Sequence, residues 1–230
     1  MHGIYGDGAY LSKNPSWHAE DSPWKARQIE KILRRNGLMP HSVAEVGCGA
    51  GEILVQLQKA FPNSDYFGFE ISPQAFSLCQ ERETSRIHFQ LKDLLEEKSK
   101  YFDVLLAIDV FEHIENYLDF LKRLRDKARF KIFHIPLDLS LQTLFRVSPI
   151  LKQREVVGHL HYFCKDTALA TLKYCGYEII DSFYTPAGIE GARLSVGARV
   201  LKLPRKLMFK INADVTVRIL GGYSLIVLAR

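Results

Sequence analysis

The chain has 230 residues, of which 47% are hydrophobic and 25% are charged, a balance typical of a globular protein. This length suits one α/β domain with additional segments, and no run of about 18 apolar residues predicts a transmembrane helix. The N-terminus lacks the basic start and apolar run of a signal peptide, so we expect a cytoplasmic protein. Cys48, Cys79, Cys164 and Cys175 show no metal-ligand spacing and are expected to be reduced.

The formal net charge of +5 is concentrated near the C-terminus. The segment from Pro186 to Arg230 holds eight Lys or Arg against two acids, whereas the other 185 residues hold 23 bases and 24 acids. A nearly neutral core is a poor surface for duplex nucleic acid, so we expect no nucleic-acid partner.

The first predicted helix begins at Ser22, which can cap it, and Pro23 suits its first turn. Apolar residues recur at helical spacing until Gly37, which ends the helix. Four aromatic residues precede or begin this helix, and two interpretations of them stay open: core packing, or a flap that closes over a bound ligand. They are Tyr10, Trp17, His18 and Trp24.

The clearest motif is a strand followed by a glycine-rich turn. Residues 43–46 predict a buried strand, Gly47, Gly49 and Gly51 follow at alternate positions, and a helical pattern begins directly after them. Glycine is needed where the backbone takes positive φ or where a ligand comes close. The dinucleotide fingerprint requires Gly or Ala where this chain has Glu52, which argues against a nicotinamide cofactor.

Three further strands each lead to an acidic residue. The strand at 65–70 ends on Glu70, which lies 19 residues after Gly51. The strand at 86–90 leads to Asp93, and the strand at 101–109 ends on Asp109. Because the carboxyl ends of parallel strands meet at one edge of a sheet, we expect these carboxylates to lie beside the glycine turn, with Glu70 accepting hydrogen bonds from the two hydroxyls of a ribose.

The remaining pattern completes an α/β domain. It predicts helices at 117–124 and 165–175, strands at 130–135, 177–184 and 223–229, and connections at 137–164 and 186–222. Alternating strands and helices with right-handed crossovers make the first strands a parallel sheet, so we expect a Rossmann-like sheet of seven strands with helices on both faces. We predict a single domain over 1–230, with an N-terminal cap and helix (1–37), a cofactor-binding core (38–184), a basic insertion or lid (185–222) and a final strand (223–230).

Two motifs carry a family resemblance. The spacing E-x-G-x-G-x-G from Glu45 to Gly51, and the sequence D-V-F-E-H-I from Asp109, resemble motifs of the class I S-adenosylmethionine-dependent methyltransferases. The resemblance covers residues 40–184 and, less closely, the last strand, which in that family is antiparallel. It implies S-adenosylmethionine as the cofactor.

The resemblance also implies roles for individual residues at the cofactor. In that family the glycine turn wraps the methionine and ribose part, the acid after the second strand holds the ribose, and the acid after the third strand binds the adenine amino group. The cofactor-binding residues implied in this way are Glu45, Gly47, Gly49, Gly51, Glu70, Ile71, Asp93, Leu94, Asp109 and Val110.

Methyl transfer requires alignment of donor and acceptor and the removal of one proton. Histidine suits a general base near neutral pH, and the candidates are His113, His134, His159 and His161, of which position favours His113 and His159 as catalytic residues. An acceptor that is already nucleophilic needs no base. We expect no metal, because no clustered set of carboxylates and histidines is evident in the sequence.

The acceptor is indicated only by resemblance. Glycan and small-molecule methyltransferases often carry a stretch similar to G-H-L-H-Y-F at 158–163, which favours an oxygen, or a nitrogen, of a small molecule or of a sugar or lipid-linked glycan intermediate. The N-P-P-[FY] signature of base-amino methylation is absent. Two alternatives stay open, an NAD-dependent oxidoreductase and a non-catalytic cofactor-binding module that regulates a partner. The sequence does not determine the oligomeric state.

Six basic residues with apolar neighbours fall within 18 residues of the predicted insertion. They are Arg193, Arg199, Lys202, Arg205, Lys206 and Lys210. Pro204 is expected to divide this segment into two short pieces. It is interpreted either as a solvated basic face over a packed apolar one, or as a lid that recruits an anionic acceptor or touches a membrane surface through 193–211.

Overall fold

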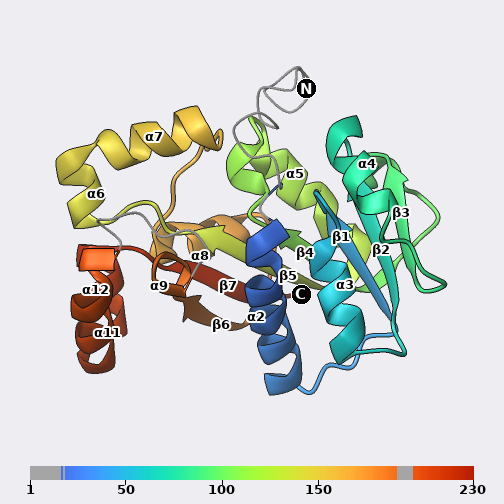
Figure 1. Cartoon of the computed structure of the whole chain (residues 1–230), viewed down its shortest axis with the longest axis horizontal. Helices are drawn as coiled ribbons and strands as arrows, with labels where there is room; N and C mark the ends of the chain where they lie inside the picture. The colour runs from blue at the N-terminus through green and yellow to red at the C-terminus, as the bar shows by residue number, and fades with distance from the viewer. Residues whose placement is uncertain (1–16, 18, 191–198) are drawn as a thin grey trace.

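A computed structural model of the chain describes residues 17, 19–190 and 199–230, and its seven strands form one mixed sheet in the order β3-β2-β1-β4-β5-β7-β6 (Figure 1). The strands are β1 (Ser42–Val46), β2 (Asp65–Glu70), β3 (Ile87–Leu91), β4 (Phe102–Ile108), β5 (Ala128–Pro136), β6 (Ile179–Thr185) and β7 (Ser224–Ala229). The first five strands are parallel, and β7 runs antiparallel to both β5 and β6. The predicted Rossmann-like sheet with an antiparallel last strand is therefore confirmed.

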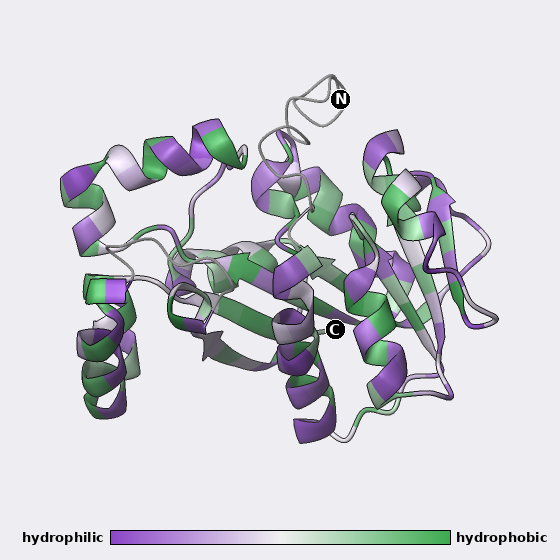
Figure 2. Cartoon of the chain, viewed as in Figure 1, coloured by the Kyte–Doolittle hydropathy of each residue, from purple (hydrophilic) through white to green (hydrophobic). Residues whose placement is uncertain are grey.

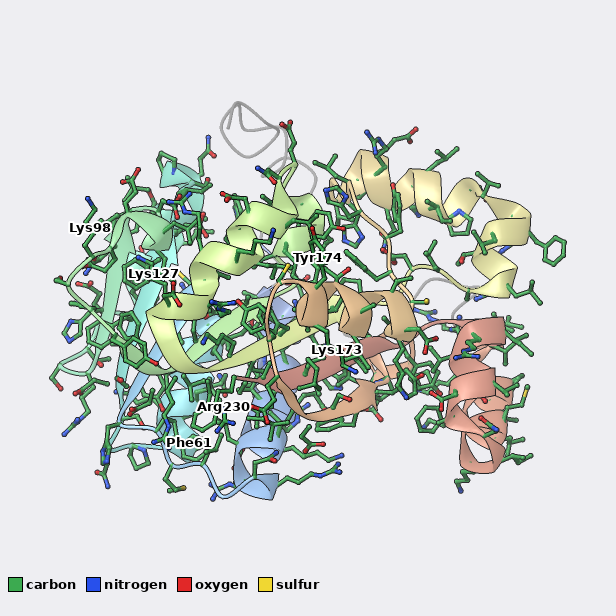
Figure 3. All side chains as sticks on the ribbon, turned by 180° about the vertical axis from the view of Figure 1, so that it is seen from behind. Phe61, Lys98, Lys127, Lys173, Tyr174 and Arg230 are labelled. Carbon is green, nitrogen blue, oxygen red and sulfur yellow. The ribbon has the colours of Figure 1, made fainter. Side chains whose placement is uncertain are left out.

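Helices cover both faces of this sheet (Figures 1 and 3). One face carries α2 (Ser22–Arg35), α3 (Glu52–Ala60) and α4 (Pro73–Gln80). The opposite face, seen in Figure 3, carries α5 (Tyr117–Leu124) and α8 (Lys165–Tyr174). This arrangement gives the molecule three layers, as the alternation of strands and helices predicts.

Each face of the sheet has its own apolar core, and β4 contributes to both. Val104 and Leu106 of β4 pack on the side of α2 and α3, whereas Leu105 and Ala107 pack on the side of α5 and α8. Successive side chains of a strand point to opposite faces, so a central strand must be apolar at every position. Figure 2 shows this as mostly hydrophobic central strands flanked by helices of mixed hydropathy.

The two long connections are largely helical. Residues 137–164 contain α6 (Leu141–Arg146) and α7 (Ser148–Val156), and residues 186–222 contain α9 (Ala187–Glu190), α11 (Lys202–Ile211) and α12 (Ala213–Leu220). Neither α6 nor α7 buries any residue fully, so they lack the apolar stripe by which the other helices are recognised. Helices α6, α7, α11 and α12 lie at the end of the molecule opposite β3 (Figure 1). Among the described residues, no helix has the length and hydropathy that crossing a bilayer requires.

The basic segment is interrupted as expected, but at Leu201, between the helical residues 199–200 and α11, rather than at Pro204 itself. Pro204 is the third residue of α11, in the first turn, where backbone N–H groups have no partner within the helix and a missing one costs little. Arg205 is buried, and its Nε and Nη2 donate to the carbonyl of Leu220 at the end of α12 at 3.2 and 2.9 Å. One of the six basic residues is therefore structural, and Arg193 lies outside the described residues.

The packing predicts a large difference between two leucine-to-alanine substitutions. Leu54 of α3 is 0% exposed, so Leu54→Ala removes buried methyl groups and leaves a cavity, and should lower the free energy of unfolding by about 2–5 kcal/mol. Leu207 of α11 is 56% exposed, and Leu207→Ala should change it by less than about 0.5 kcal/mol. Urea denaturation monitored by circular dichroism measures both, and equal losses would contradict the assigned core.

Candidate active site

A cavity of about 1170 Å³ opens at the carboxyl ends of β1, β2, β4 and β5. The order of the strands reverses between β1 and β4, and in open α/β sheets ligands bind in the crevice at this point. Of the residues singled out from the sequence, those that line the cavity are Glu45, Gly47, Gly49, Glu70, Ile71, Asp93, Leu94, Asp109, Val110, His113, His134 and His159. Gly51 does not line it.

The glycines of the turn have different structural roles, although Gly47, Gly49 and Gly51 all have positive φ. A Cβ atom on Gly51 would lie 2.5 Å from the Phe89 ring and 2.9 Å from the Cβ of Cys79, so this glycine allows α3 to pack closely on the sheet. A Cβ atom on Gly49 would meet no atom within 4 Å. Gly49 therefore keeps open a part of the cavity that a ligand can fill.

Glu70 connects the end of β2 to the glycine turn. Its Oε2 accepts a hydrogen bond from Gly49 N at 2.8 Å, and its Oε1 accepts from the backbone N–H groups of Ile71 and Ser72 at 2.9 and 2.8 Å. Burial raises the pKa of this carboxyl group, and the three backbone donors oppose that effect. Since a carboxylate offers about four lone-pair sites, one on Oε2 stays available to a ligand hydroxyl.

Glu45 of β1 is a second buried acid in the cavity wall. It is 2% exposed, and its Oε2 has no hydrogen-bond partner among the described residues. Burial raises the pKa of its carboxyl group well above the usual value, although the positive charge of Lys25 acts in the opposite direction. A buried polar atom without a partner is uncommon in proteins and marks a place where a ligand or water can bind.

Asp109 is the centre of a charged network. Its Oδ2 lies 2.8 Å from Nζ of Lys25, and its Oδ1 accepts from Nδ1 of His134 at 2.6 Å. Burial alone would raise the pKa of Asp109, but His134 and Lys25 hold it well below the usual range. Nε2 of His134 is 2.9 Å from the hydroxyl of Thr185, so both ring nitrogens of His134 are engaged and this histidine is not placed to accept a substrate proton.

Asp93 and the aromatic residues near α2 have local structural roles. Asp93 accepts a hydrogen bond from Leu95 N at 2.8 Å, which caps a short 3₁₀ turn.

Trp24 is buried, packs edge-on against His134 and donates from Nε1 to Glu190 at 3.0 Å, as the packing interpretation requires. Trp17 lines the cavity. Tyr10 and His18 lie outside the described residues.

The two preferred histidines meet at the edge of the cavity. The rings of His113 and His159 lie edge to face with their centroids 4.9 Å apart. Nδ1 of His159 donates to Asp138 at 2.7 Å, and Nδ1 of His113 donates to the carbonyl of Gly158 at 3.1 Å. Burial lowers the pKa of His113 to about 4, and the neighbouring His159 adds to this effect. His161, in contrast, bonds through Nε2 to the carbonyl of Ile114 at 3.0 Å.

The expectation that carboxylates and histidines form no cluster is wrong. One ligand atom from each of Glu112, His113 and His159 lies within 4.8 Å of the others. These residues could hold a metal ion, and the sequence could not show it because His159 is far along the chain from the other two.

Sequence reasoning also missed Lys25 and Asp138, although an acid shortly after β5 is a signal of the same kind as Asp93 and Asp109.

Comparison with known proteins relates this geometry to a domain family. Residues 44–129 match the family model described as a methyltransferase domain. No curated protein sequence matches the chain.

Three solved structures illustrate the similarity of fold. A sarcosine dimethylglycine methyltransferase from Galdieria sulphuraria, itself assigned only provisionally, is 15% identical over 90% of this chain and 84% of its own, with a TM-score of 0.63. The plantazolicin methyltransferase BpumL, solved with SAH, is 17% identical over 98% and 91% of the two chains, with a TM-score of 0.65. The N-methyltransferase NodS from Bradyrhizobium japonicum WM9, solved with S-adenosylhomocysteine, is 16% identical over 97% and 98%, with a TM-score of 0.59.

The identities are low enough that these structures show the fold alone, whereas the family match covers the glycine turn and the strands that carry Glu70, Asp93 and Asp109. Residues 44–129 therefore match a methyltransferase domain, and the chain as a whole has the fold of these solved methyltransferases.

Proposed function

We propose that the protein transfers the methyl group of S-adenosylmethionine to an oxygen, or a nitrogen, of a small molecule or a sugar-containing acceptor. The observation that carries this proposal is one continuous cavity, bordered by Gly49, Glu70 and Asp93 in one part and by His113 and His159 in another. Its volume of about 1170 Å³ exceeds the range of about 300–1,000 Å³ usual for one drug-sized ligand. A cofactor and an acceptor can therefore occupy it together.

The proposed cofactor position uses the strand ends. The adenosine part lies along Gly49 and Glu70, where the open lone pair of Glu70 accepts from a ribose hydroxyl, and Asp93 with Leu94 borders the adenine. The methionine part lies near Glu45 and Asp109. The structure leaves room for one hydrogen bond to Glu70, and a second would require one of its three backbone donors to move.

The reaction itself needs little from the protein beyond alignment. A lone pair of the acceptor attacks the methyl carbon, the carbon–sulfur bond breaks, the cofactor leaves as a thioether, and the acceptor releases its proton. His113 and His159 border the part of the cavity assigned to the acceptor. The named acceptors of the similar enzymes, sarcosine and plantazolicin, are small molecules or natural products and support an acceptor of that size.

The surface of α11 favours an acceptor at a membrane surface as a second proposal. Leu203, Leu207 and Ile211 are exposed at intervals of one helical turn, and Lys202, Lys206 and Lys210 repeat at the same interval beside them. Exposed leucines next to lysines allow a helix to dip its apolar side into a lipid interface while its charges meet anionic headgroups. This arrangement supports a cytoplasmic enzyme that touches membranes peripherally.

Calorimetry with S-adenosylhomocysteine and with NAD in separate titrations tests the proposed cofactor. We expect binding of S-adenosylhomocysteine and none of NAD, because Glu52 occupies the position where a dinucleotide turn needs a small residue. Binding of NAD would instead favour the alternative function, an NAD-dependent oxidoreductase. Binding of S-adenosylhomocysteine without turnover of any acceptor would favour a regulatory module.

The first prediction from this proposal that uses a substitution concerns the open side of the glycine turn. Gly49→Val places a branched side chain in the empty space beside Gly49 and should abolish S-adenosylhomocysteine binding in calorimetry. Gly37→Val is the matched control, since Gly37 also has positive φ and open space around it but lies away from the cavity. Both variants carry similar backbone strain, so unchanged affinity in Gly49→Val would reject the assigned cofactor position.

The second prediction concerns Glu70. Glu70→Ala removes the proposed bond to the ribose and frees the glycine turn, and should weaken S-adenosylhomocysteine binding by roughly tenfold or more. Glu83→Ala is the control, because Glu83 also accepts a backbone hydrogen bond, from Phe89 N at 2.9 Å, but does not line the cavity. Equal effects of the two substitutions would mean that Glu70 only braces the backbone.

The third prediction concerns membrane contact. The full chain should co-sediment with phosphatidylserine vesicles more than with phosphatidylcholine vesicles at low salt, and this difference should shrink at high salt. The double variant Lys206→Glu/Lys210→Glu should lose the preference. Lys98→Glu/Lys173→Glu changes the charge equally on exposed lysines away from α11 and should keep it (Figure 3). No preference for the anionic vesicles at low salt would remove this proposal.

A further inference from the structure

A compact group of potential metal ligands lies beside the cavity, on the side proposed for the acceptor. Glu112 and His113 belong to the 3₁₀ turn Phe111–His113 after β4, and His159 follows α7. One ligand atom from each of the three lies within 4.8 Å of the others, and Nε2 of His113 is 3.9 Å from Oε1 of Glu112. The backbone fixes this approach, since Leu160 N and His161 N both donate to the carbonyl of Glu112, at 2.8 and 3.1 Å.

Both histidines are oriented by acceptors on the far side of their rings. Nδ1 of His159 lies 2.7 Å from a carboxylate oxygen of Asp138, and Nδ1 of His113 lies 3.1 Å from the carbonyl oxygen of Gly158. Because both partners accept, each Nδ1 carries a hydrogen, and in the neutral ring Nε2 is then the nitrogen with the lone pair. Metal-binding histidines are held by outer partners of these two kinds.

Glu112 is the acid of the cavity region whose carboxylate has the least compensation by hydrogen bonds. It is 1% exposed, and neither carboxylate oxygen has a hydrogen-bond partner among the described residues. As an anion it is buried without compensation, and as a neutral acid it buries an unsatisfied O–H group. The nearby charges of Asp109 and Asp138 add to the negative potential, while Lys25, whose positive charge also acts on Glu112, is paired with Asp109.

We propose that Glu112, His113 and His159 form a binding site for a divalent first-row transition-metal ion such as Zn²⁺ or Fe²⁺. Two imidazoles and one carboxylate are the donors that these ions prefer. Bonds of about 2.0–2.2 Å place ligand atoms about 3.3 Å apart around one ion, so shifts of about an ångström close the present group onto the metal. His113 and His159 line the cavity, and the ion therefore keeps open coordination positions on the side of the acceptor.

The site gives the proposed reaction a more specific acceptor, and this part rests on the proposed function. An ion at this position binds an acceptor that offers an oxygen or nitrogen donor and favours loss of its proton. The proton goes to solvent, the acceptor atom forms its bond to the methyl carbon, and the carbon–sulfur bond of the cofactor breaks. His113 and His159 then serve as metal ligands rather than as general bases.

Titration of the metal-free full chain with Co²⁺ and with Zn²⁺ tests the site. Calorimetry should show saturable binding of one ion per chain, and bound Co²⁺ should give visible absorption bands. Glu112→Gln and His159→Gln should each weaken Co²⁺ binding by roughly a hundredfold or more, and Asp138→Asn by about 10–100-fold. His161→Gln is the control, because His161 lies in the same segment but bonds to the carbonyl of Ile114, and it should bind Co²⁺ as the unsubstituted chain does.

Thermal unfolding of each variant shows whether it is folded, and Asp138→Asn keeps the test decisive if substitution of a buried ligand prevents folding. The absence of saturable binding to the unsubstituted chain, or equal Co²⁺ affinity in Glu112→Gln, His159→Gln and the control, overturns the metal site. Titration with S-adenosylhomocysteine is read separately. A chain that binds S-adenosylhomocysteine but no metal rejects this site alone, and a chain that binds metal but no S-adenosylhomocysteine rejects the proposed function.

Discussion

The pairing of the partly buried Asp109 with two nitrogen-bearing side chains is the interaction on which the rest of the active region depends. Asp109 ends β4, Lys25 comes from α2 and His134 from β5, so the two short contacts at 2.8 and 2.6 Å connect three elements at the carboxyl edge of the sheet. The further contact of His134 with Thr185 reaches β6. A partly buried carboxylate without these partners would be destabilising, so the position of α2, which supplies Lys25, helps to hold Asp109 at this edge.

The acids around this edge differ in how their charge is balanced, and the difference separates structural from ligand-binding roles. Asp109 is neutralised by side chains, and Glu70 mainly by backbone N–H groups. Glu45 and Glu112, in contrast, each retain buried oxygen atoms without a partner among the described residues. A buried hydrogen-bond acceptor without a partner costs free energy. A bound molecule or ion would therefore add most to stability at these two positions.

The two long connections between strands, at 137–164 and 186–222, lie around the rest of the candidate site. The segment around α6 and α7 delivers Asp138 and His159 to the acceptor side, whereas the segment before β7 leaves an exposed amphipathic helix at the same end of the molecule (Figure 1). The cofactor side rests on regular strands, and the acceptor side rests on connections. Connections tolerate change better than strands do, which allows one sheet to serve different acceptors.

The sequence by itself determined the sheet and the residues at its carboxyl edge, because both follow from local patterns. Short stretches of sequence carry the alternating pattern of strands, the glycines of the turn and the acids at strand ends. Parallel strands then bring their carboxyl ends together at one edge of the sheet. Only the tertiary structure decided the side of the cavity around His113 and His159. His159 contacts His113 although a long connection separates them in the chain, and Lys25 reaches Asp109 from helix α2. Pro204 does not interrupt α11, because it lies in the first turn of that helix. Such contacts join residues far apart in the chain, and no local pattern records which of them will be neighbours.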